Sequence, residues 1–160
     1  SIDIEDLISI PGIGLASACR IVAAAEFFRR YVKSEGTRIN APSDVLPLLQ
    51  HLAHKKQEHF ICISLNGAQE LISIRTISIG LINQTPAHPR EVFAEALKEH
   101  ANAVILAHNH PSNLLEPSDA DIVITKQLKQ AGRILGINVL DHIIFNDKGY
   151  FSFSEENLVF

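Results

Sequence analysis

Residues 103–111, AVILAHNHP, decide the fold of this chain and contain the first residues that indicate a functional site. The apolar run from Ala103 to Ala107 predicts a buried strand, and Pro111 ends that strand because proline cannot donate to a strand ladder. Side chains alternate along a strand, so His108 and His110 are expected to point to the same face. The stretch therefore predicts two imidazoles side by side at the end of a buried strand.

A second polar group follows the loop at residues 112–117. The sequence from Ser118 to Asp121 predicts the start of a helix, with Ser118 as the N-cap and Asp121 in the first turn. Ser-x-x-Asp alone is more often a capping box than a ligand carrier, but here it accompanies paired histidines. Two imidazoles and one carboxylate on rigid elements on either side of a loop predict a three-ligand metal site. The set suits Zn2+, with a fourth position left for water.

The order of these residues resembles a known family. His-x-His-Pro, six residues and then Ser-x-x-Asp is similar to the signature of the JAMM (MPN+/JAB) metalloprotease domain. The flanking residues Ser112, Glu116-Pro117-Ser118 and Asp141-His142-Ile143-Ile144 resemble its RadC branch, and the resemblance covers essentially the whole chain. RadC sequences usually have Gly after the first of these serines, where this chain has Asn113. Asn tolerates left-handed backbone, so the turn is expected to survive.

The resemblance implies a fold and an activity. The expected fold is α+β, with a mixed central sheet flanked by helices in JAMM/MPN-like, cytidine-deaminase-like layers. The expected reaction is zinc-dependent hydrolysis of an amide, in a peptide or isopeptide bond of an unknown peptide or protein substrate. His108, His110 and Asp121 would hold the zinc, and Ser118 would support the oxyanion by a hydrogen bond, a role that competes with its capping role. RadC proteins have long carried a DNA-repair label, but no residue here indicates a repair chemistry.

Hydrolysis of an amide also needs a carboxylate that moves the proton of the attacking water to the leaving nitrogen. In JAMM domains this glutamate follows the first helix and stands just before a core strand. Glu58 matches that placement, because a strand is predicted from Phe60. Glu91 imitates the Pro-x-Glu of other JAMM branches, but it begins the helix before the histidine strand. We favour Glu58, and either residue could instead be an ordinary helix-end charge.

Residues 1–36 predict a small helical hairpin, with helices at 4–10 and 15–31 around the turn Pro11-Gly12-Ile13-Gly14. This pattern resembles the helix-hairpin-helix module, a sequence-independent DNA binder that RadC proteins carry before their JAMM domain. The amides of Gly12, Ile13 and Gly14 could hold a phosphate. Acidic and basic residues balance over residues 1–40, so any DNA contact is expected to be weak. A tight connection between two helices is the alternative interpretation.

Residues 37–160 are expected to form the JAMM/MPN-like metal-binding domain. The remaining elements alternate without strict βαβ order, which favours α+β layers. A linker is predicted at 34–42, helices at 44–56, 89–99 and 118–135, strands at 60–65, 71–79, 139–146 and 150–153, and a loop or short strand at 80–86. Asp141 and His142 could support the metal ligands or form a satisfied core pair. The other histidines are expected on the surface or in loops with no assigned role: His51, His54, His59, His88 and His100.

Composition bounds the alternatives. The chain has 160 residues, 46% hydrophobic residues and a formal charge of -4, which suits a folded protein but not tight whole-surface binding to nucleic acid. No apolar run of about 18 residues is present, so no membrane span is expected. The chain starts at Ser1 and has no Met, as expected of a fragment or processed chain, and Cys19 and Cys62 are expected to be reduced in a cytoplasmic protein.

Two other functions compete with hydrolysis. The first is a DNA-associated binding or scaffold protein whose metal site is structural or vestigial. The second, a metal-dependent nuclease, is weaker because two-metal chemistry usually needs more carboxylates.

Overall fold

The computed structural model describes residues 4–31, 36–80, 87–111 and 114–160. The chain divides into two compact units, residues 1–35 and 36–160. The expected loop at 81–86, the turn at Ser112-Asn113 and the first part of the expected linker lie outside the described residues. No helix in the described part of the chain has the length and hydrophobicity needed to span a membrane.

The first unit is a pair of helices, α1 (Ile4–Ile8) and α2 (Leu15–Tyr31). Helix α2 has the predicted bounds, whereas α1 ends two residues before its predicted end. The connection requires a glycine, because Gly12 has a φ of +92° that L side chains rarely adopt. The next helix starts at once, since the amides of Ser17 and Ala18 both donate to the carbonyl of Gly14.

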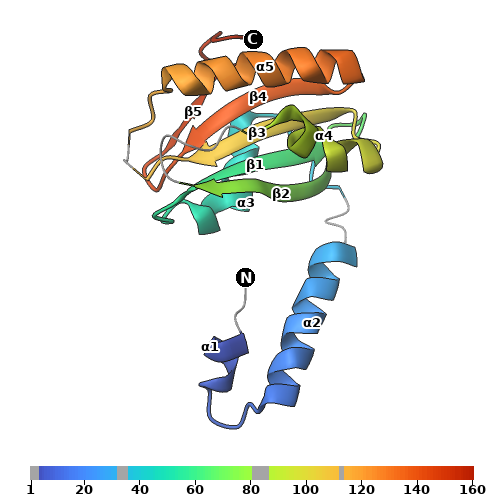
Figure 1. The fold of residues 1–160 in the computed structure, drawn as a ribbon, viewed down its shortest axis with the longest axis vertical. Coiled ribbons are helices and arrows are strands. Elements are labelled where there is room, and N and C mark those ends of the chain that lie inside the picture. The colour runs from blue at the N-terminus through green and yellow to red at the C-terminus, as the bar shows by residue number, and fades with distance from the viewer. Residues whose placement is uncertain (1–3, 32–35, 81–86, 112–113) are drawn as a thin grey trace. The chain divides into compact units, whose positions relative to one another are not determined.

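The second unit contains one five-stranded sheet, with strand order β2-β1-β3-β4-β5 (Figure 1). Its strands are β1 (Glu58–Leu65), β2 (Leu71–Gly80), β3 (Ala103–Asn109), β4 (Asn138–Phe145) and β5 (Tyr150–Ser152). The pair β3–β4 is parallel and the other pairs are antiparallel, so the sheet is mixed as predicted. Every residue of β3 is buried, which explains the apolar run from Ala103 to Ala107.

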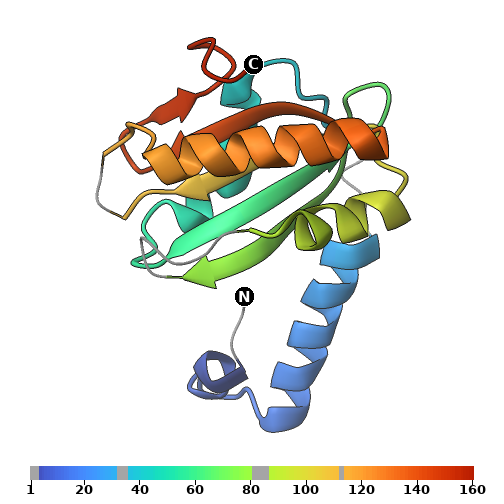
Figure 2. The same cartoon turned by 45° about the horizontal axis from the view of Figure 1, so that its top comes forward.

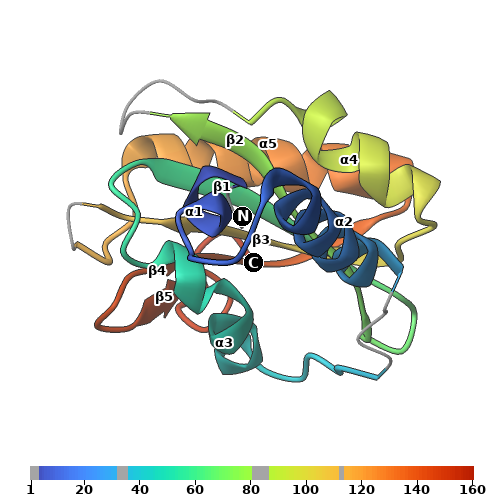
Figure 3. The same ribbon diagram turned by 90° about the horizontal axis from the view of Figure 1, so that it is seen from below.

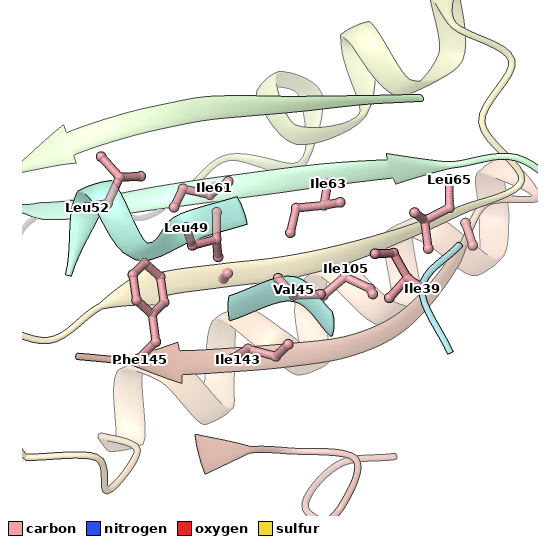
Figure 4. Close-up of a cluster of buried hydrophobic side chains, with 12 residues drawn as sticks. Ile39, Val45, Leu49, Leu52, Ile61, Ile63, Leu65, Ile105, Ile143 and Phe145 are labelled. Atoms are coloured by element: carbon pink, nitrogen blue, oxygen red, sulfur yellow. The ribbon is translucent and has the colours of Figure 1, made fainter. Parts of the chain in front are cut away.

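Helices cover both faces of the sheet (Figures 1, 2 and 3). Helices α4 (Pro89–Lys98) and α5 (Asp119–Leu135) pack on one face, against Phe60, Cys62, Val104 and Leu106. The intervening residues of β1 and β3 face the other side, where short helix α3 (Leu46–Leu49) closes a second core cluster (Figure 4). The alternation is the period of two that a strand imposes. It places His108, two residues after Leu106, on the α5 face.

The predicted helix at 44–56 is wrong in its length and continuity. The segment forms a 3-10 turn (Pro42–Val45), α3 and a second 3-10 turn (Gln50–Leu52). Pro47 has no amide hydrogen to donate inside the predicted helix, which favours short turns over one continuous helix. The carboxylate of Asp44 accepts hydrogen bonds from the amides of Asn40 and Ala41 (2.8 and 3.0 Å) at the start of the first turn.

The predicted linker is also wrong over its described end. The amide of Leu71 donates to Thr37, and the amide of Ile39 donates to Gln69, each at 2.9 Å. The side chain of Ile39 is 4% exposed and belongs to the core cluster that α3 closes. Polar composition predicted a loop, but main-chain pairing with the β1–β2 connection orders the segment.

Candidate metal centre

Three polar side chains converge where β3 ends and α5 begins. The His108 and His110 Nε2 atoms are 2.9 Å apart, His108 Nε2 is 3.3 Å from Asp121 Oδ1, and His110 Nε2 is 3.7 Å from Asp121 Oδ2. One ligand atom of each side chain lies within 4.8 Å of the others. The structure therefore brings together the three residues predicted as metal ligands.

Local structure explains why these side chains meet. His108 is the last α5-facing residue of β3, and His110 returns to the same face after Asn109. The His110 ring is held by its Nδ1, which donates to the carbonyl of Leu114 at 2.8 Å, so its Nε2 is left toward His108. Asp121 arrives from the other side of the loop as the third residue of α5.

The distances fit a zinc ion. Ligand atoms about 2.0–2.1 Å from a tetrahedral centre are about 3.4 Å from one another. The two histidine nitrogens are 2.9 Å apart, and each lies 3.3 or 3.7 Å from one of the two Asp121 oxygens, so all three groups lie within reach of one ion. Two imidazole nitrogens and one carboxylate oxygen are also a donor set that catalytic zinc sites use, with one position left open. The residues present therefore fit the metal that the donor set suggests.

Ser118 fixes the orientation of the Asp121 carboxylate. Its hydroxyl donates to Asp121 Oδ2 at 2.6 Å, its amide donates to the same oxygen at 2.8 Å, and its Oγ accepts from the Asp121 amide at 3.2 Å. This reciprocal pair is the capping box that the spacing predicted. The single hydroxyl hydrogen of Ser118 is used within the box, so the oxyanion contact expected of Ser118 would require it to rotate away.

The charge states favour metal binding. Burial lowers the pKa of His108 to about 4, so the imidazole is neutral at physiological pH, as a metal ligand must be. Burial raises the pKa of Asp121, but the neighbouring imidazoles of His110 and His108 and the Ser118 cap outweigh it and hold that pKa well below its usual range. Burial opposes it, but Asp121, the carbonyl of Leu114 and Glu58 raise the pKa of His110, so metal binding would release a proton from this ring. The site thus presents a neutral imidazole, a second imidazole that loses a proton to the metal, and an ionised carboxylate.

Glu58 lies beside this group. The register of β1 and β3 pairs Phe60 with His108, so Glu58, two residues earlier on the same face, extends toward His110. Burial and the negative charge of Asp121 raise the pKa of Glu58, against the opposing effect of His110. The effects of Asp121 and His110 agree with a Glu58 carboxyl group near the candidate ligands.

Glu91 has a different environment. It lies in the first turn of α4, its side chain is 51% exposed, and it pairs at 4.0 Å with the exposed Arg90. These contacts are those of a helix N-terminal charge. The geometry therefore favours Glu58 over Glu91 as the carboxylate of the site.

Sequence reasoning missed two groups that support the site. Asn109 points to the opposite face of β3 and is fully buried, with hydrogen bonds to the main chain on both sides of Glu58. Thr125 and His142 form hydrogen bonds behind His108. From its place on a later strand, His142 is expected, with Asp141, to support the ligands or to be a core residue, but neither Asn109 nor Thr125 has a local sequence signal.

Asp141, the neighbour of His142, is a satisfied core residue. Its carboxylate accepts from Ser152 Oγ (2.6 Å) and from the amides of Ser154 (2.9 Å) and His142 (2.7 Å). Burial raises the pKa of Asp141, although these hydrogen bonds oppose the shift. Asp141 therefore fixes the main chain at the end of β5 and next to His142.

The fold and the convergent group define an α+β domain of the JAB/MPN-like class with a candidate metal centre. A family model described as a RadC-like JAB domain matches residues 39–158. The chain belongs to this RadC-like family.

Relatives support the assignment over almost the whole chain. A UPF0758 protein of Alkaliphilus metalliredigens is 45% identical over 98% of this chain and 69% of its own length. A UPF0758 protein of Methanospirillum hungatei is 46% identical over 88% of this chain and 65% of its own length. One from Clostridium novyi is 42% identical over 97% of this chain and 70% of its own length.

Proposed function

We propose that this chain is a zinc-dependent hydrolase of amide bonds, in peptides or isopeptides. The observation that carries the proposal is the convergence of His108, His110 and Asp121 at separations that suit tetrahedral zinc. Membership of a JAB family is compatible with this chemistry. When bound there, zinc would polarise the scissile carbonyl and lower the pKa of a water to about 7.

The side chains of the site divide the remaining work. His108 presents a neutral nitrogen, His110 would give up its proton on binding the metal, and Asp121, oriented by Ser118, contributes the negative charge. Their rings and carboxylate are held by strand β3 and helix α5, so the ligand positions are set before substrate arrives.

Glu58 would act as general acid and base. A general base works best when its pKa lies near the working pH, and the pKa of Glu58 is raised in that direction. Glu58 would take a proton from the attacking water and deliver it to the leaving nitrogen. Ser118 would assist the oxyanion by turning its hydroxyl from Asp121 to the substrate.

Two experiments test the proposal. The wild type should contain about one zinc per chain by mass spectrometry, and His108→Ala should contain none, while His54→Ala, at an exposed histidine outside the site, should retain it. Glu58→Gln should keep zinc but lose hydrolysis of a peptide and isopeptide library, whereas Glu91→Gln should keep both. A wild type that binds no zinc after reconstitution would contradict the proposal.

The second candidate is a DNA-associated scaffold with a structural metal, in which the Gly12-Ile13-Gly14 turn contacts a phosphate. The observation that favours it is the exposed turn before helix α2, in which Gly12 has a positive φ. Binding of duplex DNA without hydrolysis of any peptide would favour this candidate. A cytoplasmic location belongs to both proposals, and Cys19 and Cys62 are free thiols as such a location requires.

A further inference from the structure

Hydrogen bonds connect helix α5, strand β4 and the candidate ligand His108 in one line. His108 Nδ1 lies 2.8 Å from His142 Nε2, and His142 Nδ1 lies 2.5 Å from Thr125 Oγ1. Thr125 Oγ1 donates to the main-chain carbonyl of Asp121, also at 2.5 Å. His108, Thr125 and His142 are each 0% exposed, so bulk water does not compete for these contacts.

Counting hydrogens along this line assigns the tautomers. The carbonyl of Asp121 only accepts, so the single hydroxyl hydrogen of Thr125 points toward it. In the hydrogen bond between Thr125 and His142, His142 Nδ1–H must therefore be the donor and Thr125 Oγ1 the acceptor. A neutral His142 then has a lone pair on Nε2 and accepts from His108 Nδ1–H. The lone pair of His108 is left on Nε2, the atom that faces His110 and Asp121.

The opposite assignment leaves a buried conflict. If Thr125 donated to His142, its oxygen and the Asp121 carbonyl oxygen would face each other at 2.5 Å with no hydrogen between them. Two buried acceptor oxygens would then lie in contact without a donor, which is unfavourable away from water. The rings of His108 and His142 are both 0% exposed, and a charged imidazolium buried there is unfavourable, so His142 has one hydrogen.

We propose that Thr125 and His142 are positioning residues that fix His108 in the tautomer whose Nε2 lone pair faces Asp121 and His110. The hydrogen-bond network begins and ends at Asp121, which supplies both the carbonyl that orients Thr125 and the carboxylate beside His108. It therefore links the ligand on α5 to the ligand on β3 through β4. Its effect on zinc affinity rests on the proposed metal site, whereas the tautomer does not.

Zinc affinity of the full chain, measured by competition with a chromophoric chelator, tests the effect on binding. Thr125→Val keeps the shape but removes the hydroxyl, and it should weaken zinc binding roughly 10- to 100-fold. Thr125→Ser should restore affinity close to that of the wild type. Leu128→Ala is the matched control, since Leu128 is equally buried on α5 but outside the line, and its folded form should bind zinc normally.

Imidazole 15N chemical shifts of the wild type without added zinc test the tautomer directly. His108 should show a protonated Nδ1 and an unprotonated Nε2. A protonated Nε2, unchanged zinc affinity in Thr125→Val, or Thr125→Ser as weak as Thr125→Val would each overturn the inference. A wild type that binds no zinc would refute the proposed metal site, and the same spectra would then decide the tautomer alone.

Discussion

The Asn109 side chain forms hydrogen bonds with the main chain on both sides of Glu58, a set of contacts that we call the Asn109 clamp, and its removal should lower the stability of the fold. Its Oδ1 accepts from the His59 amide at 2.7 Å, and its Nδ2 donates to the carbonyls of Gln57 (3.0 Å) and Lys55 (3.3 Å). Asn109 itself is 0% exposed. Asn109→Ala deletes all three hydrogen bonds at once.

The expected loss of stability follows from which groups water can reach. Lys55 and Gln57 are exposed residues, so water can pair with their freed carbonyls. The His59 amide lies at the start of strand β1 and is partly buried. A buried donor left without a partner lowers the free energy of unfolding by about 1–3 kcal/mol. The cavity left by the side chain adds to this, so the free energy of unfolding should fall by about 2–4 kcal/mol.

Urea unfolding measures this change, with Asn102→Ala as the control. Asn102 precedes the same strand at its other end and is exposed, and its side chain has no hydrogen bond to the described residues. Its replacement should change the unfolding free energy by less than about 0.5 kcal/mol. If Asn109→Ala also changes it by less than that amount, the clamp does not hold residues 55–59 and the argument is refuted.

Three further predictions address other parts of the chain. Burial raises the pKa of the Cys62 thiol to about 12, so its reactive thiolate is absent over pH 7–9; iodoacetamide should label only the exposed Cys19 in the native protein and both thiols in denaturant, and native labelling of both would contradict the burial. A Cβ on Gly132 would lie 2.5 Å from the carbonyl oxygen of Ile137, so Gly132→Ala should lower the unfolding free energy by about 1–3 kcal/mol despite better helix propensity; unchanged urea unfolding would contradict this close approach. Gly12 has a φ of +92°, so Gly12→Ala should distort the turn. If the turn contacts DNA as the second candidate function requires, the variant should bind a fluorescent DNA duplex more weakly than the wild type, as measured by the anisotropy of the duplex. Equal binding by the wild type and the variant would exclude the turn as the contact.

Short-range patterns predicted much of this structure because they follow from local physics. The run from Ala103 to Ala107 is apolar since both faces of β3 are covered, and the alternation of β-strands placed His108 and His110 together. Ser118 and Asp121 form the capping box that their spacing requires. The convergence of these residues could therefore be predicted without coordinates.

The helix predicted at 44–56 failed on a local signal, Pro47, but the other failures involve contacts between residues far apart in sequence. No local pattern indicates that Ile39 pairs with the chain near Gln69, or that Asn109 bonds to Gln57, 52 residues earlier. Thr125 resembles any buried helix residue until the pairing of β3 and β4 places His142 beside Leu106 and α5 packs over it. Such contacts depend on the completed topology, so only a structure could find them.

The alternation of β3 also explains why a strand end suits this chemistry. His108 faces α5, while its neighbour Asn109 faces the segment that leads into β1. Adjacent residues of one strand therefore hold the candidate metal ligands on one face and, through the other face, the main chain that carries Glu58. A shift of β3 by one residue would exchange these faces and remove the ligands and the clamp together. The register of β3, more than any single side chain, is thus what relates the candidate base to the candidate metal.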